Sequence, residues 1–145
     1  MSLIELKNVS RYWGDVRAVE KLNINIEEGE FVVLLGPSGC GKSTTLRLIA
    51  GLENVSSGEV FIGGKNVNNI DPSSRNISMV FQSYALFPHL NVEENIIFGL
   101  KVRKVKKDDR QVRLENVAEK VGLSNLLKRK PAELSGGQRQ RVALA

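Results

Sequence analysis

The amino-acid sequence predicts an α/β protein in which strands occupy the first half and helices the second. Three observations carry this prediction. Apolar and polar residues alternate near the N-terminus, whereas apolar residues recur at helical spacing from Val92 onward. A glycine-rich loop, residues 36–43, follows a strand-like run and precedes a helix-like run. Because strands come first, we expect two parts: residues 1–83, a β subdomain with the core that bears this loop, and residues 84–145, a helical subdomain.

The first part is expected to hold mainly strands and one helix. Residues 42–50 form the predicted helix, which ends near Gly51 because glycine favours the left-handed conformation that stops a helix. Two adjacent glycines at 63 and 64 predict the turn of a β-hairpin over residues 58–67. The other predicted strands are, in order, 3–9, 17–26, 30–35 and 76–81.

The second part is expected to be helical. Asn91 is a suitable N-cap for a helix that runs through Leu100. Three valines among charged residues predict an amphipathic helix over 108–121; they are Val112, Val117 and Val121. A short helix over 124–130 precedes Pro131, and the last helix begins near Ser135.

Composition is that of an ordinary globular domain. The chain has 145 residues, of which 41% are hydrophobic and 26% charged, so it is long enough to bury a core. No apolar run approaches the length of a membrane span, and no signal peptide is visible. The single cysteine, Cys40, cannot form an internal disulfide, which is consistent with a reducing compartment.

The net charge of +5 is concentrated in two basic runs, residues 101–107 and 128–130. A solvated basic face is one interpretation of these runs. Attraction to acidic lipid headgroups and binding of nucleic acid are the others. No aromatic residues alternate with the charges, which argues against stacking on a single strand, so no nucleic-acid partner is expected.

Residues 36–43 have the spacing G-x-x-x-x-G-K-S of a loop that cradles nucleotide phosphates. Glycines let successive N–H groups turn toward an anion, and the following helix adds the positive end of its dipole. Lys42 can reach the terminal phosphates, and the Ser43 hydroxyl can ligate Mg²⁺. The sequence therefore predicts a nucleoside triphosphate site. Its expected contacts are Gly36, Pro37, Ser38, Gly39, Cys40, Gly41, Lys42, Ser43 and Thr44.

A second anion-seeking element is the sequence Leu-Ser-Gly-Gly-Gln at residues 134–138. Ser135 and the two following glycine amides would offer donors at the start of a helix. Since one triphosphate already has its cradle, we expect two copies to pair head to tail, each lending this helix tip to the nucleotide of the other.

Three segments together carry a family resemblance: residues 36–43, residues 79–89 around Gln82, and residues 134–141. With these motifs the chain resembles the ATP-binding subunits of ABC transporters over essentially its whole length. The similarity is greatest to the ATPases of bacterial carbohydrate importers of the maltose and glycerol-3-phosphate type. The resemblance implies an ABC-type nucleotide-binding domain of the P-loop NTPase fold, with ATP and Mg²⁺ as cofactors.

The resemblance also implies roles for individual residues. Trp13 would stack on adenine, with Tyr12 as the alternative, although an aromatic residue beside a turn also packs locally. Gln82 would ligate Mg²⁺ together with Ser43, unless it is only a polar strand end. His89 is not expected to act as a general base. Contacts to the γ-phosphate across the dimer would come from Ser135, Gly136, Gly137 and Gln138.

The implied function is ATP hydrolysis that powers import of a sugar or related solute. Residues 82–90 would receive a membrane permease, which places the protein in the cytoplasm at the inner face of the cell membrane. In the family, an apolar strand ending in Asp-Glu activates water, and no such strand occurs here. We therefore expect the chain to be the N-terminal portion of a longer ATPase, without a catalytic residue of its own. As an isolated chain it should be marginally stable, bind ATP weakly and not turn it over.

Two other functions remain open from the sequence. The chain could belong to a soluble ABC-type ATPase that acts on nucleic acid or ribosomes, or to a nucleotide-dependent dimerisation module without catalysis. The transported solute cannot be predicted, because the permease and its binding protein select it.

Overall fold

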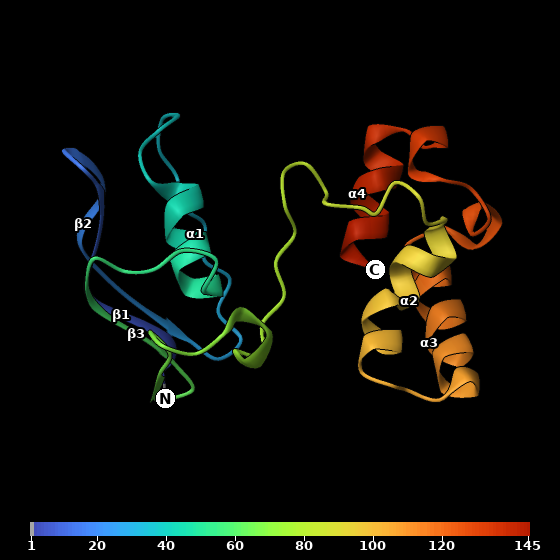
Figure 1. The fold of residues 1–145 in the computed structure, drawn as a ribbon, viewed down its shortest axis with the longest axis horizontal. Helices are drawn as coiled ribbons and strands as arrows, with labels where there is room; N and C mark the ends of the chain where they lie inside the picture. Colours follow the sequence, from blue (N-terminus) through green and yellow to red (C-terminus); the bar gives the residue numbers. More distant parts are fainter. Residues whose placement is uncertain (1) are drawn as a thin grey trace. The chain divides into compact units, whose positions relative to one another are not determined.

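The computed structural model describes residues 2–145, which divide into two compact units, Met1–Met79 and Val80–Ala145 (Figure 1). The sequence-based boundary between residues 83 and 84 falls in the same irregular segment. Each unit has its own hydrophobic core. No helix in the described part of the chain is both long and apolar enough to span a bilayer.

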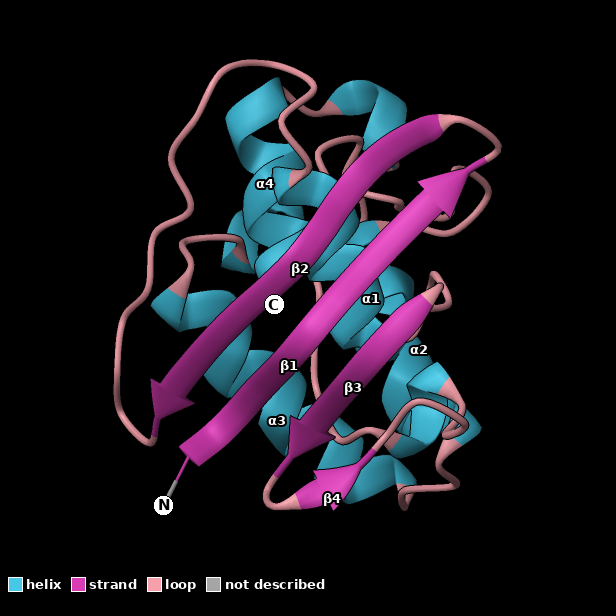
Figure 2. Ribbon diagram, turned by 90° about the vertical axis from the view of Figure 1, so that its left-hand side faces the viewer, coloured by secondary structure: helices cyan, strands magenta, loops and turns pink. Residues whose placement is uncertain are grey.

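The first unit is built on a four-stranded antiparallel sheet in the order β2-β1-β3-β4 (Figure 2). Its strands are β1 (Ser2–Trp13), β2 (Val16–Glu27), β3 (Ser57–Ile62) and β4 (Lys65–Asn66). In the centre of the sheet, Leu6 of β1 lies opposite Ile24 of β2 and Val60 of β3. The strands predicted over 3–9 and 17–26 are confirmed and are longer than expected.

The turn between β3 and β4 confirms the predicted hairpin. Gly63 and Gly64 have φ angles of 55° and 75°. Positive φ at both central residues is the geometry of a tight hairpin turn whose twist matches that of the strands, and glycine adopts it without steric cost.

Helix α1 (Lys42–Ala50) covers one side of this core through Leu48, which is 1% exposed. It ends at Gly51, as predicted. The carbonyl groups at its end are satisfied by Arg75, whose Nη1 donates to the carbonyl oxygens of Leu48 and Ile49, both at 3.0 Å. Burial lowers the pKa of the Arg75 guanidinium from its ordinary value. This arginine ties α1 to the 3-10 turn at Pro72–Ser74.

Two predicted strands, 30–35 and 76–81, are wrong. Both segments are irregular, and Phe31 and Leu35 are 90% and 87% exposed. The physical reason is that a strand needs a hydrogen-bonded neighbour, and no segment of residues 2–145 pairs with either run. The apolar composition of both runs favours a strand, but the sheet of this structure does not include them.

The second unit contains α2 (Val92–Val102), α3 (Lys107–Lys120) and α4 (Gly136–Leu144). Its core consists of Val92, Ala118, Leu123, Leu134 and Val142. The predicted cap at Asn91 is confirmed: its side chain accepts from the N–H of Glu94, whose carboxylate accepts from the N–H of Asn91.

Two details of the helical prediction need correction. Of the helix expected over 124–130, only a 3-10 turn at Ser124–Leu126 forms; Lys130 is extended, as expected for a residue before proline, and a second 3-10 turn follows at Pro131–Glu133. The buried face of α3 is formed by Leu114 and Ala118, whereas Val112 is 57% exposed. Of the three predicted valines, Val117 and Val121 are half-buried and Val121 packs against the core of the second unit, so only Val112 was wrong.

Candidate functional site

Residues 36–40 of the glycine-rich loop are exposed, Gly41 is buried, and the loop leads directly into α1. Gly41, with φ of 90°, is the N-cap of the helix, and a Cβ there would collide with the carbonyl oxygen of Ala18 and lie 3.3 Å from Val19 Cγ2. The loop thus lies against β2 so closely that only glycine fits at this position. Since no side chain caps α1, the N–H groups of its first turn remain available to a ligand.

Lys42 folds back over the loop. Its Nζ donates to the carbonyl oxygens of Gly36 (2.8 Å) and Pro37 (2.7 Å) and lies 3.4 Å from Cys40 Sγ. Within the described residues Lys42 forms no ion pair. An uncompensated ammonium group, held over a loop of backbone amides, is an arrangement that suits a polyanion.

The predicted contacts at residues 36–44 are therefore brought together by one loop and the first turn of α1. They fit the phosphates of a nucleotide: the donors are exposed, and the positive end of α1 faces the loop. Ser43 is exposed at the second helical position, where its hydroxyl is free to ligate a cation. Gln82 belongs to the other unit, so the shared Mg²⁺ site of Ser43 and Gln82 stays a prediction.

Trp13 ends β1 and is 45% exposed, with the Arg11 guanidinium 5.4 Å from its ring centroid. It pairs with Val16 at the tip of the β1–β2 hairpin. Two residues further along β2, Ala18 touches the loop at Gly41. One hairpin thus carries both the exposed indole ring and the contact with the phosphate loop, which supports the predicted adenine platform.

We expect Trp13→Ala to weaken ATP binding several-fold, since stacking of a base on an aromatic ring contributes about 1–3 kcal/mol. The affinity is measured by equilibrium dialysis with labelled ATP. Tyr12→Ala is the matched comparison, because Tyr12 is the neighbouring ring on the same strand. Unchanged affinity in Trp13→Ala would show that the ring only packs against Arg11.

The tip of α4 is a complete capping box. Ser135 Oγ accepts from the N–H of Gln138 at 3.3 Å, and Gln138 Oε1 accepts from the N–H of Ser135 at 2.8 Å. A Cβ at Gly136 or Gly137 would meet no atom within 4 Å, so there is open space beside these two residues. The hydroxyl proton of Ser135 and the amides of the two glycines remain as donors for an anion.

Residues 82–90 form an irregular segment that is fastened to α2. Asn95 holds it at Phe87: its Oδ1 accepts from the Phe87 N–H (2.9 Å), and its Nδ2 donates to the Phe87 carbonyl (3.2 Å). The Phe87 ring lies 4.4 Å from that of Phe98, centroid to centroid, and both side chains are 39% exposed. Gln82 and His89 are exposed in this segment. Sequence reasoning missed Asn95, which is recognisable only from its contacts.

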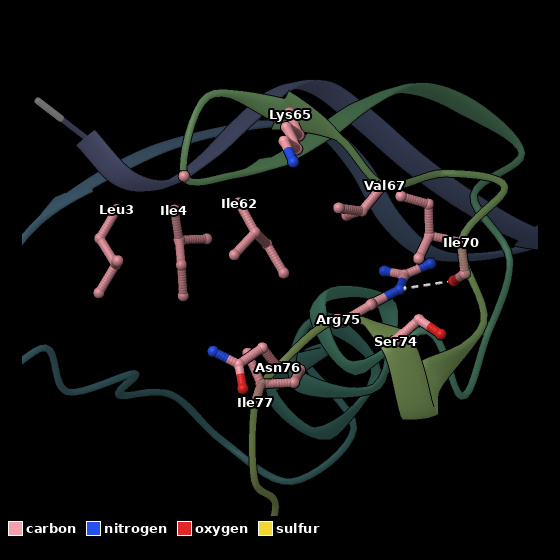
Figure 3. A pocket seen from close by; sticks show the side chains of 11 residues that line it. Leu3, Ile4, Ile62, Lys65, Val67, Ile70, Ser74, Arg75, Asn76 and Ile77 are labelled. Carbon is pink, nitrogen blue, oxygen red and sulfur yellow. Dashed lines mark hydrogen bonds between the residues drawn. The ribbon is translucent and has the colours of Figure 1, made fainter.

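A pocket of about 480 Å³ opens beside the sheet of the first unit (Figure 3). Apolar side chains of β1 and β3 face it, and the Arg75 guanidinium lies at its edge, where Nε donates to the Ile70 carbonyl. None of its lining residues belongs to the predicted nucleotide site. Within residues 2–145 no cluster of three or more His, Cys, Asp or Glu side chains could hold a metal ion.

Comparison with known proteins agrees with the loop geometry. A model of the ABC transporter family matches residues 19–145. The maltose/maltodextrin import ATP-binding protein MalK of Mannheimia succiniciproducens is 57% identical over 144 residues, and MalK of Escherichia coli K12 is 56% identical. In both cases the alignment covers 99% of this chain but 39% of the relative, so the chain spans about two-fifths of their length.

Solved structures share the fold. The dimeric bacterial ABC transporter cassette MJ0796 matches with a TM-score of 0.87 and 37% identity, over 97% of this chain and 66% of that chain. A dimeric post-hydrolysis state of the same cassette, bound to ADP and Pi, gives a TM-score of 0.86 at 35% identity, over 97% and 67%. The ABC-type nucleotide-binding fold predicted from the sequence is confirmed.

Proposed function

Because the chain belongs to the ABC transporter family, we propose that it forms part of the ATP-binding subunit of a sugar importer. In this proposal it works at the inner face of the cell membrane, where binding and hydrolysis of ATP drive the import. The MalK relatives, named as maltose/maltodextrin import ATP-binding proteins, favour a sugar as the solute.

The observation that carries the proposal is the cradle at residues 36–43, with the Lys42 ammonium held over it and with no acidic partner in the described residues. When ATP binds, its phosphates supply the anion that this ammonium lacks. Lys42 then exchanges the carbonyl oxygens of Gly36 and Pro37 for phosphate oxygens, and the amides of the loop and of α1 donate to the same group.

The second part of the proposal is a head-to-tail dimer. A nucleotide in the cradle leaves its terminal phosphate exposed, and the tip of α4 offers the Ser135 hydroxyl and two free amides. We assign the tip of one copy to the nucleotide of the other, so that the anion neutralises two positive helix ends at once. The dimeric state of the similar cassette structures supports this arrangement.

The third part concerns the permease. We assign residues 82–90 as its docking surface, since Phe87 forms a half-exposed, tilted aromatic pair with Phe98 of α2 and Asn95 fixes the segment on that helix. In this proposal Gln82, at one end of the same segment, ligates the Mg²⁺ of the bound nucleotide. Solute selection lies with the permease.

The cradle is tested by protection of the single cysteine. Cys40 is exposed inside the loop, so a maleimide reagent should modify it readily, and Mg-ATP should slow the reaction at least about tenfold, as expected for ligand well above its Kd. Rates are followed by mass spectrometry at several ATP concentrations. AMP, which lacks the outer phosphates, is the control. Equal labelling with and without Mg-ATP would contradict the assignment of the loop.

A further inference from the structure

The net positive charge of this protein comes from its second unit. Residues 1–79 contain eight Lys and Arg against nine Asp and Glu, whereas residues 80–145 contain thirteen against seven. The first unit, which carries the phosphate loop, is therefore nearly neutral. The nucleotide site does not account for the net charge of +5.

The charge gathers at the turn between α2 and α3, which we call the basic turn (Figure 1). It covers residues 101–107 and holds five cations: Lys101, Arg103, Lys104, Lys106 and Lys107. All five side chains are exposed, and none forms an ion pair with any described residue. The turn is thus a concentrated positive surface without ion pairs, and the nearest acidic residues in the sequence, Asp108 and Asp109, follow it in the first turn of α3.

The backbone of the basic turn is well defined. The N–H of Val105 donates to the carbonyl of Leu100, and the N–H of Lys104 donates to that of Lys101, both at 3.0 Å. Together with φ of 56° at Lys104, these two bonds form the Schellman motif that closes a helix. The cations are therefore presented from a fixed turn rather than from a loose loop.

Helix stability explains only part of this charge. Lys101, in the last turn of α2, faces the negative end of that helix dipole, which is favourable. Lys106 and Lys107, however, occupy the N-cap and first position of α3, where cations are unfavourable, and Lys106 makes no capping hydrogen bond. The favourable charges at the start of α3 are those of Asp108 and Asp109, so helix stability does not explain the charge of Lys106 and Lys107.

The surface continues along α3. Arg110 and Arg113 follow Lys106 at i+4 and i+7, which places the three on one side of the helix. Arg110 Nε is buried without a hydrogen-bond partner among the described residues. One apolar side chain lies within the basic turn itself: Val102, between Lys101 and Arg103 in the sequence, is 65% exposed. Cations mixed with exposed aliphatic side chains are typical of surfaces that lie against lipid headgroups.

We propose that the basic turn docks on the anionic phospholipid headgroups of a membrane surface. The headgroups supply a dense layer of phosphates, which complements a cluster of cations without ion pairs, and the interfacial region accepts the Val102 side chain. The absence of aromatic side chains in residues 101–107 disfavours a single-stranded nucleic acid, whose bases would need stacking partners. This interaction goes beyond the proposed ATPase role and needs no nucleotide.

The test is co-flotation of the full chain with vesicles. Vesicles of phosphatidylcholine with 30 mol% phosphatidylglycerol should bind the chain, pure phosphatidylcholine vesicles should not, and binding should fall as salt rises from about 50 to 500 mM. The triple variant Lys104→Gln, Lys106→Gln, Lys107→Gln should lower the partition coefficient at least about tenfold, and up to about a hundredfold, because each cation near such a surface contributes about fivefold.

The matched control is Lys128→Gln, Arg129→Gln, Lys130→Gln. It removes the same formal charge from three exposed residues at the opposite end of α2, where Lys128, unlike the cations of the basic turn, forms an ion pair with Glu93 at 2.6 Å. This control should retain most of the binding. Circular dichroism checks that both variants keep the helical content of the parent chain.

A second measurement uses the unmodified chain. Anionic vesicles should protect Lys104, Lys106 and Lys107 from acetylation, while Lys65 of the first unit stays reactive. Three results would overturn the proposal. The two triple variants could lose the same amount of vesicle binding, or the chain could bind neutral vesicles as well as anionic ones. The chain could also bind a 20-mer oligonucleotide more tightly than the anionic vesicles at the same salt. Vesicle binding tests the lipid-docking proposal, and protection of Cys40 by ATP tests the nucleotide site. Because these are independent measurements, one proposal can fail while the other holds.

Discussion

Replacement of Lys42 by alanine is expected to weaken Mg-ATP binding by about 10- to 100-fold, because a hydrogen bond to a charged group contributes about 1.5–3 kcal/mol. In the structure the Lys42 ammonium is held over the loop by the carbonyls of Gly36 and Pro37. Its loss removes the one positive side chain of the cradle. The affinity is measured by displacement of a fluorescent ATP analogue.

Arg47→Ala is the control for this variant. Arg47 is exposed on the same helix, so its replacement removes one positive charge from α1 without touching the loop. It should bind ATP nearly as well as the parent chain. If both variants lost the same affinity for ATP, the loss would come from long-range electrostatic attraction to α1. The assignment of Lys42 as a direct contact of the phosphates would then be wrong.

Leu48→Ala is expected to lower the free energy of unfolding by about 2–5 kcal/mol, the range for removal of a fully buried leucine side chain. Leu48 is 1% exposed and packs in the core with Leu6 and Val60. Because α1 carries Lys42 at its start, the cradle should be lost as this core opens. Urea unfolding followed by circular dichroism measures the change.

Leu46→Ala is the matched control on the same helix, since Leu46 is 49% exposed. Its replacement should change the free energy of unfolding by no more than about 0.5 kcal/mol. An equal effect of the two substitutions would mean that α1 does not pack on the sheet through Leu48. If the free energy of unfolding of the parent chain is itself below about 2 kcal/mol, Leu48→Ala should show no cooperative unfolding transition, whereas Leu46→Ala should keep one.

Local chemistry explains why much of the site was predictable from sequence. The start and end of α1 follow from Gly41 and Gly51, whose conformations need no distant partner. The capping boxes of α2 and α4 satisfy their amides within four residues, so Asn91 and Ser135 mark helix starts in the sequence itself. The turn at Gly63 and Gly64 is equally local.

Features that depend on distant residues were missed or wrong. The runs 30–35 and 76–81 have strand composition, but a strand forms only where another strand supplies hydrogen bonds. Nothing in the sequence distinguishes Arg75 and Asn95 from other polar residues. In the structure, Arg75 donates to the last carbonyl groups of α1, and Asn95 binds the backbone of Phe87. Nothing in their neighbours along the chain reveals these contacts.

By itself, the sequence determined the phosphate loop, the helix starts and the family to which the chain belongs, because each of these depends on residues that are adjacent in the chain. Only the tertiary structure decided that Gly41 is pressed against the carbonyl of Ala18, that the Lys42 ammonium is uncompensated, and that Leu114 rather than Val112 is buried on α3. Burial and hydrogen bonding between distant segments are properties of the folded chain, since they depend on which surfaces meet.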